Sequence, residues 1–143
     1  MKFWDTSAVV PLCLEESTSP SVRRILEADP EMVVWWGTRS ECVSALERRR
    51  REGSLSPAEQ QLARKVLNTL TSVWIEVQPS EDVRIEAERV LELQPLRTAD
   101  AFQLAAAIEW CKGRSTYMEF VVFDRRLRNA SQAEGFSVVP AIA

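Results

Sequence analysis

Short apolar runs alternate along the chain with longer segments in which apolar residues recur every three or four positions. The short runs are rich in Val, Phe and Trp, and they predict buried β-strands at residues 2–5, 31–36, 74–77, 120–123 and 136–139. The longer segments predict helices at residues 7–15, 20–28, 38–52, 56–73, 80–94, 98–111 and 124–134. This alternation indicates an α/β fold, a sandwich of helices around a mainly parallel sheet.

Several helix starts carry side chains that can accept hydrogen bonds from the first turn. Thr38 with Glu41 three residues later has the pattern of a capping box, and so has Ser56 with Glu59. In the segment that begins at Ser56, helical spacing predicts an apolar face made of Leu62, Val66, Leu70 and Val73. The segment 98–111 is apolar on nearly all sides after its first turn, which predicts a buried helix.

The size and composition are those of an ordinary globular domain. With 143 residues, 45% hydrophobic and 27% charged, we expect residues 1–143 to form a single domain with its own core. No apolar run approaches the roughly 18 residues of a membrane span, and the N-terminus lacks a signal-type apolar core. The three cysteines form no C-x-x-C motif. We therefore expect a cytoplasmic protein that does not enter the membrane.

The absence of histidine from the chain restricts the possible chemistry. It excludes a Ser-His-Asp or Cys-His device and histidine-ligated zinc, so catalysis must use carboxylates, hydroxyls, arginine or a metal. The net charge of −3 argues against a protein that coats nucleic acid by bulk attraction. Arginine is nevertheless clustered at residues 47–52 and 124–128, and its planar fork suits phosphate.

Four acids stand at transitions from strand to helix. Asp5 and Asp124 directly follow predicted strands, whereas Glu41 and Asp100 lie in the first turns of predicted helices. Each acid alone is explained by helix capping or by the helix dipole. In parallel sheets, however, ligand sites lie at the carboxyl ends of the strands, where these four acids would face one cleft.

Convergence of the acids would require a neutralising partner. Two carboxylates about 4 Å apart repel by roughly 4 kcal/mol at an effective dielectric constant near 20, and a cap contributes only about 1 kcal/mol. Oxygen ligands without histidine or thiolate favour Mg²⁺ or Mn²⁺. Such an ion can activate a water and offset charge on a phosphate. The residues therefore point to metal-assisted hydrolysis of a phosphodiester.

Four segments together resemble a known family. The stretches "WDTSAVV", "SE" at 40–41, "LRTADAFQLAAAI" and "FVVFDRRL" resemble the PIN-domain ribonucleases, and more narrowly the VapC-type toxins of toxin–antitoxin pairs. The resemblance covers essentially the whole chain in matching order and spacing. It implies a three-layer α/β/α sandwich with a central parallel sheet, and an endoribonuclease activity that depends on Mg²⁺ or Mn²⁺.

The resemblance also implies roles for individual residues. The family's metal ligands fall on Asp5, Asp100 and Asp124, and its helical glutamate, a further catalytic acid, falls on Glu41. The family's hydroxyl falls on Thr6 or Ser7, where it would contact phosphate or metal-bound water. Thr6 or Ser7 can also start the helix and leave the Asp5 carboxylate free. Arginines beside the acids that could contact RNA phosphates are Arg97, Arg125 and Arg126, with Arg48 two helical turns beyond Glu41.

Two positions depart from the family pattern. Val122 stands where relatives commonly have threonine, and Gln103 stands where many have histidine. Neither change removes a metal ligand, and both leave rate and substrate choice open. Trp35 and Trp36 could stack on bases, although the core or a dimer interface is the favoured place for them.

We therefore predict a metal-dependent endoribonuclease that acts as the toxin of a toxin–antitoxin pair. The expected partners are an RNA substrate, a cognate antitoxin protein whose C-terminal segment occupies the active-site groove, and a second copy of the chain in a homodimer. Alternatives are a PIN nuclease with another duty, such as RNA processing or DNA cleavage, and a non-catalytic PIN scaffold that binds RNA or protein. A phosphoryl-accepting receiver domain is excluded, because none of the three lysines is placed for it.

Overall fold

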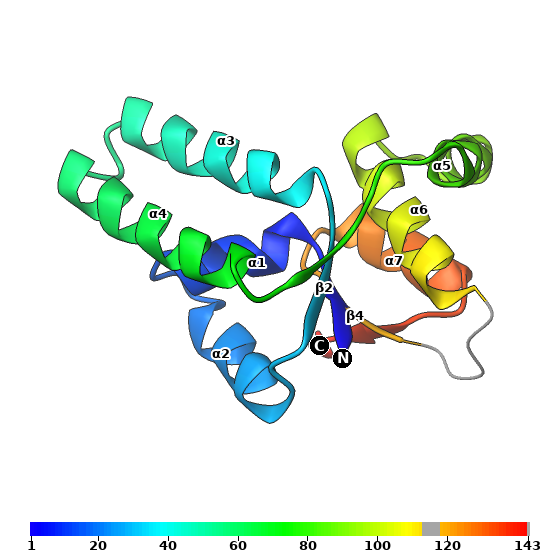
Figure 1. The fold of residues 1–143 in the computed structure, drawn as a ribbon, viewed down its shortest axis with the longest axis horizontal. Helices are drawn as coiled ribbons and strands as arrows, with labels where there is room; N and C mark the ends of the chain where they lie inside the picture. Colours follow the sequence, from blue (N-terminus) through cyan, green and yellow to red (C-terminus); the bar gives the residue numbers. More distant parts are fainter. Residues whose placement is uncertain (113–117, 143) are drawn as a thin grey trace.

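In the part of the chain that the structure describes, five short strands form one parallel sheet at the centre of the molecule (Figure 1). The structure is a computed structural model that describes residues 1–112 and 118–142. The strands are β1 (Lys2–Trp4), β2 (Met32–Trp35), β3 (Ile75–Val77), β4 (Glu119–Val121) and β5 (Ser137–Val139). Their order across the sheet is β3-β2-β1-β4-β5, and each neighbouring pair is parallel. The five predicted strands are confirmed.

Helices cover both faces of this sheet. One side carries α1 (Thr6–Cys13), α2 (Ser19–Ala28), α3 (Thr38–Arg51) and α4 (Pro57–Thr71), and the other carries α5 (Glu81–Leu93), α6 (Thr98–Cys111) and α7 (Arg125–Ala133) (Figure 1). None of the helices in the described ranges combines the length and the apolar composition that a membrane crossing requires. The predicted three-layer α/β/α sandwich is confirmed.

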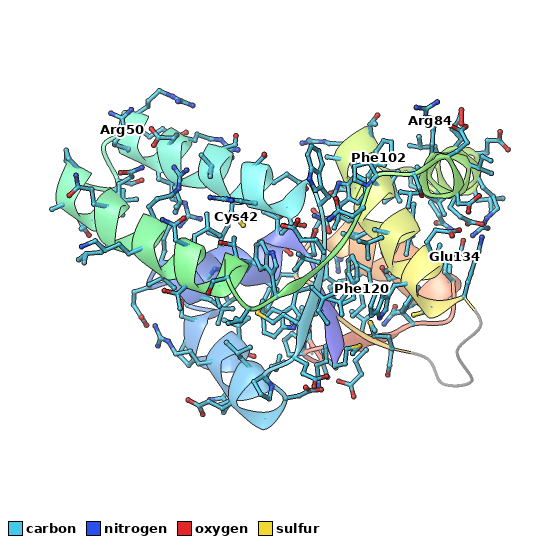
Figure 2. The ribbon with its side chains drawn as sticks, in the orientation of Figure 1. Cys42, Arg50, Arg84, Phe102, Phe120 and Glu134 are labelled. Carbon is cyan, nitrogen blue, oxygen red and sulfur yellow. The ribbon has the colours of Figure 1, made fainter. Side chains whose placement is uncertain are left out.

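The alternation of side chains along the strands creates two cores. Successive residues of a strand point to opposite faces, so Val33 packs into the cluster beside α5 and α6 and Val34 into the cluster beside α1, α3 and α4. Phe120 of β4 belongs to the first cluster and Cys42 of α3 to the second (Figure 2). Val122 is fully buried in the first cluster. Because both faces of the sheet are covered, the inner strand β2 is apolar throughout, whereas β1, β4 and β5 begin with Lys2, Glu119 and Ser137.

One predicted capping box is confirmed and the other is wrong. The Ser56 hydroxyl accepts a hydrogen bond from the Glu59 backbone N–H at 3.1 Å, and the Glu59 carboxylate accepts one from the Ser56 N–H at 3.1 Å. At the start of α3 the N-cap is Gly37, which has no side chain to cap the helix. Thr38 is instead fully buried, and its hydroxyl accepts a hydrogen bond from the Gln103 side chain. A long-range partner therefore replaces the expected local one.

The predicted apolar face of α4 is wrong for most of its residues. Leu62 and Val66 are 62% and 40% exposed, and Val73, beyond the end of α4, is 72% exposed. Leu70 does pack against the core, but the buried residues of the helix are Ala63 and Leu67. Helical spacing identifies residues that share a face, but it does not decide which face turns inward. The small side chain of Ala63 lets the helix approach the core closely, and the larger apolar side chains are left at the surface.

Candidate active site

The four acids singled out in the sequence line one pocket at the carboxyl ends of the strands. Asp5 directly follows β1, Asp124 follows β4, Glu41 lies on α3, and Asp100 lies on α6. The pocket has a volume of about 610 Å³. Its lining includes the acids Asp5, Glu41, Asp100 and Asp124, the hydroxyl residues Thr6, Ser7, Ser40 and Ser44, and the arginines Arg48 and Arg49. Residues far apart in sequence therefore meet where the parallel topology predicts.

Asp5 is the deepest of the four acids, with only 4% of its surface exposed. It is the N-cap of α1, because its Oδ2 accepts a hydrogen bond from the Ser7 backbone N–H at 3.0 Å. Thr6 does start the helix, as expected, but the expectation that this would leave the Asp5 carboxylate free of capping is wrong. Burial raises the pKa of Asp5 from 3.8 to about 6, and the nearby charge of Asp100 adds to the rise, while hydrogen bonds from Ser7 lower the pKa.

Glu41 lies half-buried in the first turn of α3. Its pKa is raised from 4.5 to about 7, mainly by burial and also by the carboxylates of Asp5 and Asp100. The hydrogen bond that Glu41 accepts from the Gln103 side chain acts in the opposite direction. Asp5, Glu41 and Asp100 are therefore close enough for their charges to influence one another.

Asp100 and Asp124 complete the acidic group. The pKa of Asp100 is raised by burial and by the charge of Asp124, while Arg97 and Arg126 lower it. Asp124 is exposed and caps α7, since its Oδ1 accepts a hydrogen bond from the Leu127 N–H at 2.9 Å. Capping and a place in the cleft are thus compatible, because a cap uses only one of the two carboxylate oxygens.

The two hydroxyls that follow Asp5 have protein partners. The Ser7 hydroxyl accepts a hydrogen bond from the Phe123 backbone N–H at 2.9 Å, and the Thr6 hydroxyl accepts one from Gln103 Nε2 at 3.1 Å. Both residues still line the pocket. The hydroxyls are therefore held in place, which prepares them for a ligand at fixed positions.

The arginines around the site differ in their surroundings. Arg97 and Arg126 are exposed and act electrostatically on Asp100. Arg125 is exposed in the first turn of α7 and does not line the pocket. The Arg128 guanidinium donates hydrogen bonds to the carbonyl oxygens of Val122 and Pro140 at 2.7 and 2.8 Å. Arg128 therefore fastens α7 to the chain around β4 and β5.

The donor set fits a hard divalent cation. The acids that line the pocket, Glu16 among them, offer carboxylates without histidine or thiolate, which is the ligand chemistry of Mg²⁺ or Mn²⁺. Within residues 1–112 and 118–142, no three acidic or cysteine side chains close tightly enough on one point to hold an ion alone. Mg²⁺ usually keeps several waters and takes one or two protein carboxylates directly. The pocket thus fits an ion whose shell is shared with water and a phosphate ligand, and not an all-protein cage.

The sequence pattern missed the part that Gln103 plays in this site. Gln103 is fully buried and contacts residues of both α1 and α3 through its side-chain amide. In the sequence it stands out only as a departure from a family pattern. The usable signal was its polarity, because Gln103 interrupts a helix that is otherwise apolar after its first turn.

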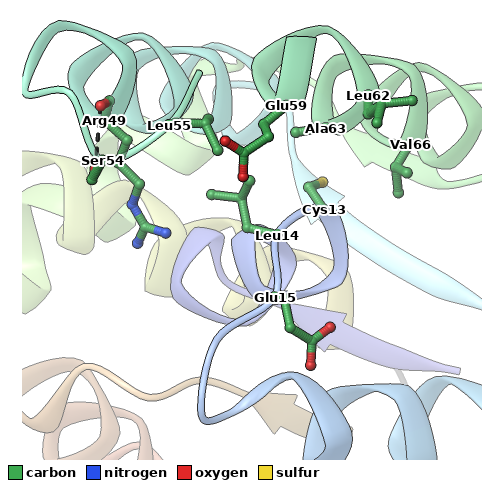
Figure 3. A pocket seen from close by; sticks show the side chains of 10 residues that line it. All are labelled: Cys13, Leu14, Glu15, Arg49, Ser54, Leu55, Glu59, Leu62, Ala63 and Val66. Carbon is green, nitrogen blue, oxygen red and sulfur yellow. Dashed lines mark hydrogen bonds between the residues drawn. The ribbon is translucent and has the colours of Figure 1, made fainter. Parts of the chain in front are cut away.

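A second pocket adjoins the acidic one. It has a volume of about 540 Å³ and is shown in Figure 3, where Leu62 and Val66 project from α4 and Cys13 and Leu14 come from the end of α1. Arg49 lines both pockets. The two pockets are therefore neighbours that meet at Arg49.

Comparisons with known proteins agree with this fold. No curated protein matches the sequence. A toxin–antitoxin complex from Klebsiella pneumoniae is 19% identical with a TM-score of 0.64, covering 98% of this chain and 97% of its own. VapC20 of Mycobacterium tuberculosis, a toxin that cleaves the sarcin–ricin loop, is 17% identical with a TM-score of 0.69, covering 95% and 96%. FitAcB from Neisseria gonorrhoeae is 12% identical with a TM-score of 0.66, covering 96% of both chains.

At these identities, the solved structures establish a shared fold. The family itself follows from the sequence profile of the PIN domain, which matches residues 2–132 and so spans every acid in the pocket. This chain therefore belongs to the PIN domain family.

Proposed function

We propose that the protein is a Mg²⁺- or Mn²⁺-dependent endoribonuclease that acts as the toxin of a toxin–antitoxin pair, with residues 1–143 as one PIN domain. The observation that carries this proposal is the pocket that gathers Asp5, Glu41, Asp100 and Asp124. Burial and mutual repulsion raise the pKa of the first three. Such an arrangement opposes folding at neutral pH unless a cation binds, and so it indicates selection for a ligand.

The residues in the pocket have distinct roles in this proposal. Asp5, Asp100 and Asp124 hold the ion, and Thr6 and Ser7 orient phosphate or water through their hydroxyls. When bound, Mg²⁺ or Mn²⁺ supplies an activated water and offsets charge on the phosphate. The carboxylate of Glu41, with its pKa near 7, accepts the proton released by the attacking water.

Basic residues on two sides of the acids suit an RNA backbone. Arg48 and Arg49 line the pocket toward the end of α3, and Arg97 and Arg126 stand beside Asp100. We assign Arg97, Arg125 and Arg126 to phosphate contacts on one side and Arg48 to the other. Arg49 forms an ion pair with Glu16, so it is less available for phosphate. A chain passing between the two sides would place one phosphodiester over the acids.

Two protein partners belong to the proposal. VapC20, FitAcB and the complex from Klebsiella pneumoniae share the fold, and the last is a toxin–antitoxin complex. We infer that a cognate antitoxin covers the acidic pocket of this chain, with apolar side chains lying on Leu62 and Val66 in the adjoining pocket. We also infer a homodimer, which light scattering of the purified chain would detect as twice the monomer mass.

The decisive experiment is cleavage of a broad RNA pool by the purified protein. We expect products with 5′-phosphate and 3′-hydroxyl ends in Mg²⁺ or Mn²⁺, and no cleavage in EDTA. Asp100→Asn should abolish cleavage, because it removes a proposed ligand. Asp82→Asn changes an exposed aspartate on α5 and serves as the matched control. Intact RNA with metal-loaded wild type, together with RNA retention on a filter, would favour the scaffold alternative.

A second assay separates the toxin from a processing nuclease. Expression of the chain alone should arrest growth of a bacterial host, and co-expression with the antitoxin should restore growth. Asp100→Asn should remove the arrest at equal protein level. RNA cleavage in vitro without growth arrest, and without an antitoxin gene beside this one, would favour a nuclease with a processing duty.

A further inference from the structure

Gln103 joins three helices at the acidic pocket. Its side chain is fully buried on α6, one helical turn after Asp100. Its Nε2 lies 3.1 Å from the Thr6 hydroxyl oxygen, 2.9 Å from the Thr38 hydroxyl oxygen and 2.9 Å from Oε1 of Glu41. Thr6 and Thr38 are the first residues of α1 and α3. One amide therefore contacts the first residue of α1, next to Asp5, and the helix α3 that carries Glu41.

The hydrogen-bond inventory fixes the orientation of this amide. An ionised Glu41 carboxylate only accepts hydrogen bonds, so it requires the NH₂ end of Gln103 and repels the oxygen end. The NH₂ group has two hydrogens for three oxygens within reach, and one hydrogen must be shared between two acceptors. Each of the three contacts thus constrains the other two.

The other end of the same amide is left without a partner. Among the described residues, Oε1 of Gln103 is buried and accepts no hydrogen bond. A buried carbonyl oxygen without a donor is unfavourable for folding. The amide therefore directs its donor end to Thr6, Thr38 and Glu41 and leaves its acceptor end unpaired within the described part of the chain. This one-sided pairing indicates that the donor end is the part of the side chain that the site uses.

We propose that Gln103 is a positioning residue. Through its side-chain amide it holds the Glu41 carboxylate and the first residues of α1 and α3 at fixed positions relative to Asp100, which lies on the same helix as Gln103. The proposal follows from the geometry of one amide between Thr6, Thr38 and Glu41. Its consequence for catalysis rests on the proposed nuclease function. Thr6 directly follows Asp5, so the hydrogen bond between Gln103 and Thr6 also links Asp5 to the helix that carries Asp100. Gln103 itself does not line the pocket, and it acts through Glu41.

Three substitutions separate positioning from packing. Gln103→Met keeps the length and removes the donor. Gln103→Glu keeps the shape but presents an acceptor to Glu41. Gln103→His restores an N–H donor, which an imidazole ring carries in place of an amide. Ser131→Ala is the matched control, because Ser131 is also fully buried and its hydroxyl has no hydrogen-bond partner among the described residues, but it lies on α7 outside the pocket.

The first readouts are Mn²⁺ affinity by calorimetry, cleavage rate per folded molecule and thermal midpoint. Loss of a residue that orients a metal-site group typically costs about 10- to 100-fold in metal affinity or activity. We expect a loss in that range for Gln103→Met and a larger one for Gln103→Glu. Gln103→His should recover part of the loss, and the loss in Gln103→Met should exceed any change in the folded fraction that its thermal midpoint reports. Ser131→Ala should match wild type in affinity and rate.

A double substitution tests whether Gln103 acts through Glu41. If it does, Gln103→Met should add little to the loss caused by Glu41→Gln, because the group that it positions is already changed. Fully additive losses would overturn the proposal. Wild-type affinity and rate in Gln103→Met, or losses that only follow the folded fraction, would overturn it as well.

A spectroscopic readout keeps the proposal testable without metal. The side-chain carboxyl ¹³C resonance of Glu41 in the metal-free protein should shift in Gln103→Met and return toward wild type in Gln103→His. An unchanged resonance in Gln103→Met would overturn the proposal. If wild type neither binds Mn²⁺ nor cleaves RNA, the nuclease function fails, while this resonance still decides whether Gln103 positions Glu41.

Discussion

The backbone N–H of Phe123 donates a hydrogen bond to the hydroxyl of Ser7 at 2.9 Å, although 116 residues separate them. Ser7 lies two residues after Asp5, and Phe123 directly precedes Asp124. The hydrogen bond therefore joins the segments that carry two acids of the pocket. β1 and β4 are paired neighbours in the sheet, and this contact extends their alignment beyond the last strand residues.

Replacement of Ser7 tests that connection. Ser7→Ala leaves the Phe123 N–H without its acceptor, and an unsatisfied buried donor costs about 1–3 kcal/mol. We expect the free energy of unfolding in urea to fall by that amount and RNA cleavage to weaken. Ser17→Ala, at an exposed serine, should change the free energy by less than about 0.5 kcal/mol. Equal effects of the two substitutions would contradict the structural role of Ser7.

The stability of the metal-free protein should fall as the pH rises toward neutrality. The pKa of Asp5 rises from 3.8 to about 6 on folding, and that of Glu41 from 4.5 to about 7. The folded state therefore binds protons more tightly than the unfolded state. Its gain is fully present below the unfolded pKa values and is lost as the pH rises through about 6 to 7. For Asp5 the shift corresponds to roughly 3 kcal/mol.

Thermal melts in EDTA between about pH 4.5 and 7.5 would measure this loss. Carboxylates with lowered pKa values, such as Asp29 and Glu86, contribute stability that is lost at lower pH, so they do not produce a decline in this window. Added Mn²⁺ should raise the thermal midpoint more at about pH 7 than at about pH 5, where protons compete for the same oxygens. A metal-free midpoint that is flat or rises across the window would contradict the raised pKa values of Asp5 and Glu41.

Glu41→Gln should make the protein more stable and less active. The substitution removes a half-buried charge that faces Asp5 and Asp100, and the new amide oxygen can still accept from Gln103. We expect a higher thermal midpoint at neutral pH in EDTA and a severe loss of RNA cleavage, as in other sites that trade stability for function. Glu92→Gln, at an exposed glutamate of α5, is the control. A lower midpoint for Glu41→Gln would show that its charge is already compensated.

Two leucines on α4 test which face of this helix is buried. Leu67 is fully buried, whereas Leu62 is 62% exposed. Leu67→Ala should lower the free energy of unfolding by about 2–5 kcal/mol, because it opens a cavity. Leu62→Ala should lower it by less than about 0.5 kcal/mol. Chemical denaturation of the two variants measures these changes. A larger fall in the free energy of unfolding for Leu62→Ala than for Leu67→Ala would show that the face predicted from helical spacing is the buried one.

Gly37 should not tolerate a larger residue. A Cβ at this position would lie 2.5 Å from Nε1 of Trp35, and the Trp35 ring is stacked on Phe102 with centroids 5.6 Å apart. Gly37→Ala must displace the indole, so we expect a cost of about 1–3 kcal/mol and a shift in tryptophan fluorescence. Pro57→Ala, at the exposed first residue of α4, is the control, because it also introduces alanine at a helix start but far from the indole. Unchanged fluorescence in Gly37→Ala would contradict the stacked arrangement.

The order of strands and helices was accessible from sequence because it depends on local periodicity. The apolar runs identified all five strands, and Ser56, Ser80 and Asp124 marked helix starts through side chains that reach their own first turn. The gathering of the acids also followed, since parallel strands place their carboxyl ends at one edge. The pairing of Thr38 was missed because its partner is 65 residues away, and local spacing carries no information about it.

By itself, the sequence determined the α/β class, the parallel sheet and the four acids at its carboxyl edge, because these depend on period, chain order and residue chemistry. Only the tertiary structure decided that Asp5 is nearly buried, that α4 turns Ala63 and Leu67 inward, and that Gln103 reaches Thr6, Thr38 and Glu41. Periodicity defines a face without its direction. Burial and hydrogen-bond partners depend on how segments distant in sequence pack together. That packing raises the pKa values of Asp5 and Glu41 and so determines their protonation near neutral pH.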